Sequence, residues 1–355
     1  MSKFFTNRYQ ALTPYTPGEQ PRDMQYIKLN TNESPFPPSA KAIEAAAKAA
    51  KRLQLYPDPT YKALHEVLAA YHGVTPDMVL ATNGSDEILN FAFMAFCDET
   101  HPALFADITY GFYSVFATLN HVPFAEIPLK SDFSLSIDDY IGKKGTVFIA
   151  NPNAPTGLAL PLSEIERLLA ADKERVVVID EAYVDFGTES AVSLISRYDN
   201  LLVTRTFSKS RSMAGARLGY GIGSPALISD LNTVKYSTNP YNVNSMSAAA
   251  GLGVMSDEAY TVSCCKEIME TREYAKTGLK KLGFEMTDAK GNFLFARHPK
   301  LDGETVYKAL KARGILVRHF SRAPIADYNR ITIGTRADMQ TLIDTLADIL
   351  KEHTV

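Results

Sequence analysis

The sequence predicts an α/β fold, in which a mostly parallel sheet of about seven strands is sandwiched by helices and joined to a smaller α+β domain. Two patterns support this prediction. Short, almost continuously apolar runs alternate with helical patterns between residues 79 and 222, as is typical of a parallel sheet covered on both faces. Beyond residue 255 a long helical pattern leads into a second, shorter alternation of strands and helices.

The elements are expected in the following order. Helices are predicted over 39–52 and 60–73, separated by the turn Tyr56-Pro-Asp-Pro59. Strands follow at 79–82, 103–106, 122–127, 146–150, 175–180, 201–204 and 218–222, with helices at 88–97, 110–119 and 161–170. An irregular connector over 236–243 precedes helices at 245–255 and 256–282. In the C-terminal part of the chain, strands are predicted at 284–286, 293–296, 315–317 and 331–333, and helices at 304–313 and 337–352.

These elements divide the chain into three segments. Residues 1–50 form an N-terminal arm and part of the small domain, residues 51–262 form the large domain, and residues 263–355 form the C-terminal small domain. A chain of 355 residues is long enough for two such cores.

The composition excludes several classes of protein. A net charge of −3 gives no reason to expect nucleic acid or an anionic membrane as a partner, and no apolar segment approaches the roughly 20 residues of a membrane-spanning helix. The N-terminus lacks a secretory apolar core, and 3 cysteines do not make a disulfide framework, so we expect a cytoplasmic protein. The 7 histidines show no metal-ligand spacing, so we expect no catalytic metal.

Lys209 is the first candidate for chemistry. It follows a predicted strand, has Thr206 and Ser208 beside it, and precedes Arg217 by eight positions. In parallel sheets function collects at the carboxyl ends of the strands, where these groups suit a cationic pocket for a phosphate and a carbonyl. A solvated basic loop is the alternative.

Two further strand ends carry polar groups. Asp180 ends the most hydrophobic strand, and a carboxylate there is costly to bury unless it pairs with a cation. Gly84, Ser85 and Asp86 form a strand-to-helix turn whose free backbone N–H groups offer an anion site. Ordinary helix capping is the alternative at both places. Together, a lysine amine, a buried carboxylate and a phosphate site match the requirements of pyridoxal 5′-phosphate, whose aldehyde forms an imine with lysine and whose ring nitrogen needs a carboxylate.

Four motifs, in this order, carry a resemblance to a known family. They are Asn151-Pro-Asn-Ala-Pro-Thr-Gly157, Asp180-Glu-Ala-Tyr183, Ser208-Lys209 and Ala214-Gly-Ala-Arg-Leu-Gly-Tyr220. Over nearly its whole length the chain resembles the pyridoxal-phosphate aminotransferases of the aspartate aminotransferase fold. Narrower motifs are similar to the histidinol-phosphate branch, namely Leu12-Thr-Pro-Tyr15, Leu29-Asn-Thr-Asn-Glu33, Tyr56-Pro-Asp58 and Asn329-Arg-Ile-Thr-Ile-Gly334.

The resemblance implies a role for each cofactor residue. Lys209 would bond to the cofactor aldehyde and later move the substrate proton, Asp180 would pair with the ring nitrogen, and Tyr183 would contact the ring hydroxyl. Tyr110 would stack on the ring. The phosphate would be held by Gly84, Ser85, Asp86, Thr206, Ser208 and Arg217, and by Tyr56 of the neighbouring subunit in a homodimer with shared active sites.

The substrate side is also implied by the resemblance. Arg330 would bind the substrate carboxylate, Arg318 with Tyr15 would meet a distal phosphate, and Asn32 belongs to the same group. The sequence departs from the family where an asparagine usually precedes Pro-Thr-Gly, because Ala154 stands there, and Asn153 is the expected substitute. Taken singly, Tyr110 and Tyr183 also suit core aromatics, Arg330 an ordinary strand end, and Arg318 a solvated pair with His319.

The function implied by the resemblance is reversible amino transfer between histidinol phosphate and 2-oxoglutarate, with glutamate as the donor. An aromatic aminotransferase or a threonine-phosphate decarboxylase on the same cofactor are alternatives. A non-enzymatic binding module is a third reading, but it predicts loss of the lysine or the aspartate, and both are present.

Overall fold

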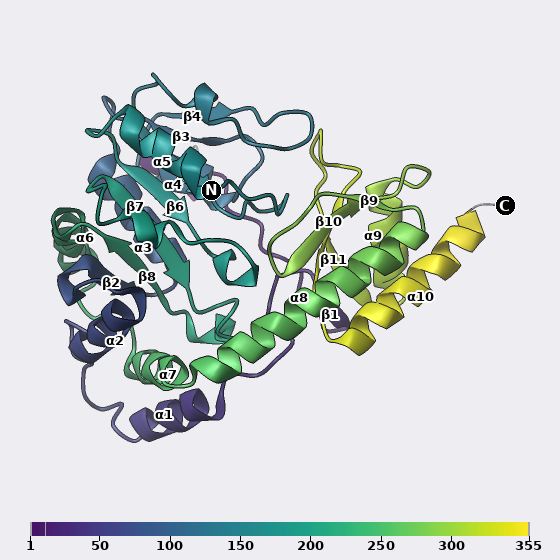
Figure 1. Cartoon of the computed structure of the whole chain (residues 1–355), viewed down its shortest axis with the longest axis horizontal. Helices are drawn as coiled ribbons and strands as arrows, with labels where there is room; N and C mark the ends of the chain where they lie inside the picture. Colours follow the sequence, from purple (N-terminus) through teal and green to yellow (C-terminus); the bar gives the residue numbers. More distant parts are fainter. Residues whose placement is uncertain (1, 11, 354–355) are drawn as a thin grey trace.

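The computed structural model describes residues 2–10 and 12–353. Its large sheet has the order β2-β8-β7-β6-β5-β3-β4, and β8 is antiparallel to both of its neighbours while the other pairs are parallel (Figure 1). The strands are β2 (Val79–Thr82), β3 (Ala103–Ala106), β4 (Phe124–Ile127), β5 (Thr146–Ala150), β6 (Val177–Asp180), β7 (Leu201–Thr206) and β8 (Gly219–Gly223). The predicted fold class is confirmed.

Helices cover both faces of this sheet, as the apolar strands require. They are α1 (Ala40–Ala50), α2 (Lys62–His72), α3 (Ser85–Phe96), α4 (Phe112–Leu119), α5 (Leu162–Ala171), α6 (Pro225–Thr238) and α7 (Ser245–Met255). Odd and even residues of β5 enter separate cores, because successive side chains of a strand point to opposite faces. Val147 and Ile149 pack in one apolar cluster, whereas Phe148 stacks on Phe93 of α3 with ring centroids 4.1 Å apart in another.

A second sheet has the order β1-β11-β12-β10-β9 and draws on both ends of the chain. Its strands are β1 (Ile27–Leu29), β9 (Glu285–Met286), β10 (Phe293–Arg297), β11 (Ile315–His319) and β12 (Asn329–Thr332). β1 pairs in parallel with β11, and the other pairs are antiparallel. The helices α8 (Glu258–Lys281), α9 (Gly303–Ala312) and α10 (Arg336–His353) complete this smaller domain, and α8 runs between the two domains (Figure 1).

Two packing features differ from the expected division of the chain. Helix α1, expected with the N-terminal arm, packs on α7, and its Ala42 shares the core of the large sheet. Small residues permit this close approach, since a Cβ on Gly253 would lie 2.5 Å from the carbonyl oxygen of Lys41. The boundary expected after residue 262 falls inside α8.

Two helices also differ from the sequence prediction. Helix α6 was not expected, although Ser224 caps it by accepting from the backbone N–H of Leu227 and Pro225 occupies its first turn. The connector therefore begins at Asn239, not at residue 236. Helix α3 begins at Ser85, three residues before the apolar pattern, because Gly84 ends the preceding turn.

Within the described residues, no helix combines the length and the apolar character needed to cross a membrane.

Candidate functional site

Two adjoining cavities lie at the carboxyl ends of the large sheet's strands, facing the smaller domain. The Arg217 cavity, of about 400 Å³, is lined by Ser85, Asp86, Asp180 and Arg217 among others. The Arg330 cavity, of about 360 Å³, is lined by Tyr15, Arg318 and Arg330 among others. Both share five lining residues, which are Thr31, Tyr110, Ala154, Tyr183 and Lys209. The two cavities therefore form one site that is divided at Lys209.

Lys209 is presented by a loop that closes on itself directly after β7. The backbone N–H of Phe207 donates to Leu218 across the loop, and that of Met213 donates to Phe207. The amine of Lys209 donates to the carbonyl of Thr31 at 3.1 Å and lies 5.8 Å from the centre of the Tyr183 ring. This amine stands at the junction of the two cavities, where a cofactor and a substrate can both reach it.

Asp180 presents a buried carboxylate to the Arg217 cavity. It ends β6, is 5% exposed, and accepts hydrogen bonds from the hydroxyls of Tyr113 at 3.0 Å and Thr204 at 3.1 Å. Burial raises the pKa of Asp180 to about 6, against this hydrogen bonding. Its side-chain partners are neutral hydroxyls, so the carboxylate suits a cationic group placed in the cavity.

The N-terminus of α3 and Arg217 form a cradle for an anion at the other end of this cavity. The guanidinium of Arg217 contacts the Asp86 carboxylate at 3.0 Å and donates to the Ser208 hydroxyl at 3.4 Å. Gly84 has φ +82°, and a Cβ there would lie 2.7 Å from the Arg217 guanidinium. Backbone N–H groups at a helix start and an adjacent arginine are the elements of a phosphate site.

Tyr110 and Thr206 complete the Arg217 cavity. The Tyr110 hydroxyl donates to Asp86 at 2.6 Å, and burial together with that carboxylate raises the pKa of Tyr110 well above its ordinary value. Thr206 accepts from the backbone N–H of Ser208 at 3.1 Å, which fixes the turn that leads to Lys209. The lysine amine, the buried carboxylate and the anion cradle together fit pyridoxal 5′-phosphate.

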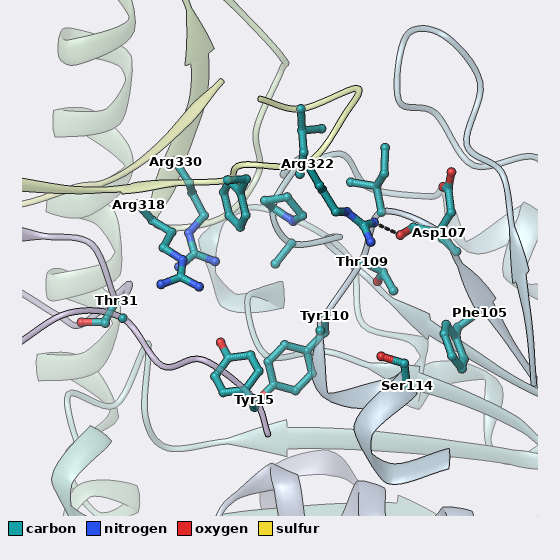
Figure 2. A pocket seen from close by; sticks show the side chains of 18 of the residues that line it. Tyr15, Thr31, Phe105, Asp107, Thr109, Tyr110, Ser114, Arg318, Arg322 and Arg330 are labelled. Carbon is teal, nitrogen blue, oxygen red and sulfur yellow. Dashed lines mark hydrogen bonds between the residues drawn. The ribbon is translucent and has the colours of Figure 1, made fainter. Parts of the chain in front are cut away.

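The Arg330 cavity is cationic. Arg318 of β11 and Arg330 of β12 are register partners on neighbouring strands, and Figure 2 shows both guanidinium groups pointing into the cavity near Tyr15. Arg330 donates to the carbonyl of Asn30 at 3.1 Å, its Nε has no partner among the described residues, and burial lowers its pKa. Arg318 donates to the carbonyls of Thr16 and Pro17. Two guanidinium groups in one cavity are suited to carboxylate or phosphate.

Arg322 also lines the Arg330 cavity, although no sequence pattern predicts it. It comes from the loop between β11 and β12 and donates to the backbone carbonyl of Asp107 in the large domain (Figure 2). A loop arginine without periodicity or motif gives no sequence signal for such a position.

Asn153 does not lie where it was expected. Its amide donates to the carbonyl of Ile108 and the hydroxyl of Thr156, both at 2.9 Å, and its oxygen accepts from Thr109 at 2.7 Å. These bonds hold the Asn-Pro-Asn turn, and Ala154 lines both cavities instead. The expected contact of Asn153 with the cofactor is therefore not supported.

Asn32 and Tyr56 line neither cavity of the chain. Asn32 is 0% exposed and its amide donates to the Tyr183 hydroxyl at 3.0 Å, so it contacts the site through Tyr183. Tyr56 is 81% exposed, stacks on Tyr241 with centroids 4.6 Å apart, and lines neither cavity of its own chain.

Comparison with known proteins agrees with this geometry. A family model described as aminotransferase class I and II matches residues 24–346. The chain is 45% identical over 351 residues to the histidinol-phosphate aminotransferase of Clostridium acetobutylicum, covering 99% of this chain and 100% of that one. It is 48% identical over 353 residues to histidinol-phosphate aminotransferase 2 of Thiobacillus denitrificans, covering 98% and 99%.

Solved structures share the fold. The histidinol-phosphate aminotransferase of Sinorhizobium meliloti, in complex with pyridoxal-5′-phosphate, aligns with a TM-score of 0.90 at 22% identity, covering 99% of both chains. The aspartate aminotransferase of Thermotoga maritima aligns with a TM-score of 0.81 at 24% identity, covering 92% of both. The family match and the full-length relatives show that this chain belongs to the class I and II aminotransferases, in the family of the histidinol-phosphate aminotransferases.

Proposed function

We propose that this protein is a pyridoxal-phosphate-dependent aminotransferase that moves an amino group between histidinol phosphate and 2-oxoglutarate. The observation that carries the proposal is the position of Lys209 at the junction of two cavities, one suited to the cofactor and one lined by Arg318 and Arg330. When bound, pyridoxal 5′-phosphate supplies an aldehyde carbon for the amino group and a ring that accepts an electron pair.

The residues of the Arg217 cavity hold the cofactor in this proposal. Asp180, in its ionised form, keeps a proton on the ring nitrogen, while the hydroxyls of Tyr113 and Thr204 hold the carboxylate in place. Arg217 and the first backbone N–H groups of α3 hold the phosphate. Gly84 leaves room for that approach, because a side chain there would displace the Arg217 guanidinium.

Lys209 and the Arg330 cavity act on the substrate. The Lys209 amine would take the proton from the substrate Cα and deliver it to the cofactor carbon that accepts the amino group, and in the reverse transfer it would carry the proton back. Arg330 binds the carboxylate of glutamate, and Arg318 with Tyr15 binds the phosphate of histidinol phosphate. One cavity has to accept both anions in turn, and two neighbouring guanidinium groups meet that requirement.

A single-turnover measurement tests the substrate assignment. The cofactor-loaded protein is mixed separately with histidinol phosphate, phenylalanine and threonine phosphate, and the cofactor absorbance is followed. We expect conversion to the pyridoxamine form with histidinol phosphate, and 2-oxoglutarate should reverse it. Conversion with phenylalanine alone would overturn the assignment, as would decarboxylation of threonine phosphate without amino transfer.

The assembly and location belong to the same proposal. We propose a homodimer in which Tyr56 reaches the cofactor phosphate of the neighbouring subunit. An exposed apolar patch around Tyr56 supports this, with Leu53, Leu55, Tyr236 and Tyr241 exposed by 55%, 51%, 49% and 41%.

A cytoplasmic location is supported by the cysteines, since Cys97, Cys264 and Cys265 are all free thiols.

A further inference from the structure

The segment Asn30–Asn32, directly after β1, contacts three side chains of the site in succession. The carbonyl of Asn30 accepts from Arg330, the carbonyl of Thr31 accepts from Lys209, and the side chain of Asn32 donates to Tyr183. The first two contacts use the backbone, which any residue supplies. The third depends on the asparagine side chain.

The orientation of the Asn32 amide follows from its other contacts. Its backbone N–H donates to the Thr332 hydroxyl at 2.9 Å, and that hydroxyl in turn lies 3.0 Å from the Asn32 side-chain oxygen. Because the hydroxyl accepts the first bond and donates the second, the amide oxygen faces Thr332 and the NH₂ group faces Tyr183. Asn292 donates to the Asn32 carbonyl at 3.0 Å, and both asparagines are 0% exposed.

This orientation determines what the Tyr183 hydroxyl does. The hydroxyl accepts from Asn32 at 3.0 Å, so its own proton is not used in that bond. Tyr183 lines both cavities, and the cations that face it are Lys209, with Nζ 5.8 Å from the ring centre, and Arg330 of β12. Carboxylates also line the cavities, at Glu33, Asp86, Asp107, Glu126 and Asp180, but among the described residues the Tyr183 hydroxyl donates to none of them. Neither cation accepts a hydrogen bond, so the proton is free to point into the cavity.

We propose that Asn32 is a positioning residue that holds the Tyr183 hydroxyl as an acceptor and so directs its proton toward the ring oxygen of the cofactor. This inference rests on the proposed cofactor. A donated proton stabilises the anionic form of the oxygen that accepts it, and therefore lowers the pKa of the chromophore that Lys209 forms with the cofactor. Thr332 links this contact to the small domain, because it holds the amide from β12.

An absorbance titration of the cofactor-loaded protein tests the proposal and needs no substrate, so its result is separate from the substrate assignment. Asn32→Gly removes the amide and keeps the backbone, since glycine adopts the φ of +54° found at this position. We expect the chromophore pKa to rise by roughly 0.5 to 1 unit, which corresponds to one lost hydrogen bond. Asn32→Gly with the wild-type chromophore pKa would overturn the proposal.

A double variant separates this role from a merely structural one. Tyr183→Phe should raise the chromophore pKa by itself, and adding Asn32→Gly should shift it no further, because Asn32 acts through the missing hydroxyl. Two shifts that add in the double variant would contradict the inference, since additive effects indicate independent sites.

If Asn32→Gly does not fold, a second pair of variants tests the same role of Asn32. Thr332→Val removes the hydroxyl that holds the amide and should raise the chromophore pKa, whereas Thr332→Ser keeps the hydroxyl and should restore the wild-type value. Equal values for valine and serine would count against the proposal.

Discussion

At the scale of single residues, the ionised carboxylate of Asp180 in the cofactor site lowers the free energy of unfolding of the protein. Asp180 has a raised pKa of about 6, because the effect of burial outweighs that of the hydrogen bonds from the Tyr113 and Thr204 hydroxyls, which lower the pKa. The ordinary value in an unfolded chain is about 3.9. The folded protein therefore binds this proton more tightly than the unfolded chain does. Its free energy of unfolding falls as the pH rises from about 4 to about 6, and stays lower above that window.

Removing this charge should stabilise the cofactor-free protein. We expect Asp180→Asn to raise the free energy of unfolding by about 1–3 kcal/mol near pH 7.5 and to leave it unchanged near pH 4. Urea denaturation of both proteins at the two pH values measures this difference. The same variant should lose most of its turnover, because a neutral amide does not hold the proton on the ring nitrogen. If the variant and the wild type had equal free energies of unfolding at both pH values, burial of the Asp180 carboxylate would not be the cause of its raised pKa.

Burial alone would suggest two lysines as candidates for the covalent bond to the cofactor, Lys209 and Lys235. Lys235 of α6 is 1% exposed, and burial lowers its pKa, a feature often found in reactive lysines. Its amine, however, donates to the carbonyl of Pro59 and lines neither cavity of the site. The position of Lys209 decides between them.

Borohydride reduction of the cofactor-loaded protein distinguishes the two lysines. Lys209→Ala should abolish the reducible cofactor adduct and turnover together, whereas Lys235→Met should keep the adduct. Peptide mapping after reduction identifies the modified residue. An adduct that persists in Lys209→Ala would remove Lys209 from its proposed role.

At the scale of elements, the start of α3 determines whether a phosphate can approach the backbone. The early start at Ser85 depends on Gly84, whose φ of +82° lies in the region that favours glycine. Gly219 of β8 makes a second close contact, because a Cβ there would lie 2.4 Å from the backbone nitrogen of Ser85. Two glycines thus bring a strand, a helix N-terminus and Arg217 together.

Substitution of Gly84 should therefore weaken cofactor binding. Gly84→Ala places a methyl group against the Arg217 guanidinium, and we expect the cofactor dissociation constant to rise about 10- to 100-fold, equivalent to the loss of one or two charge-assisted hydrogen bonds. Gly73→Ala is the matched control, because Gly73 also has a positive φ, of +67°, but no atom of the described residues lies within 4 Å of the added methyl group. Equilibrium dialysis measures both, and similar losses would show backbone strain alone.

At the scale of the whole molecule, the proposed dimer divides each active site between two chains. Tyr56 lies on the turn before α2, and Lys235 of α6 holds the same turn through Pro59. Exposure of Tyr56 in one chain and its absence from that chain's own cavities are both consistent with a role in the neighbouring subunit.

Mixing two defective variants tests this shared site. Lys209→Ala and Tyr56→Ala should each lose activity alone. A heterodimer of the two contains one site with both Lys209 and Tyr56 intact, so after unfolding and joint refolding we expect about a quarter of wild-type turnover, from random assortment of the chains. Turnover equal to the average of the separate variants would contradict a shared site, and sedimentation velocity gives the assembly state in the same samples.

Local sequence patterns determined the architecture and the centre of the site. Strands such as β5 and β6 are continuous apolar runs, and their burial on both faces follows from that pattern. Asp180 and Lys209 stand at strand ends, so the topology of a parallel sheet already brings them to one edge. Among the longer elements, α6 is the one that the sequence patterns did not predict, although Ser224 and Pro225 mark its start.

Only the tertiary structure decided what the remaining polar side chains do. Asn153 and Asn32 both belong to motifs that suggested contact with a ligand. The side chain of Asn153 instead forms hydrogen bonds to Ile108 and Thr156, and the buried side chain of Asn32 donates to Tyr183. Arg322 reaches the cavity from a loop that carries no motif. An amide or guanidinium takes whichever partners the packed chain brings within hydrogen-bond distance, and partners such as Thr332, 300 positions from Asn32, do not appear in any local pattern.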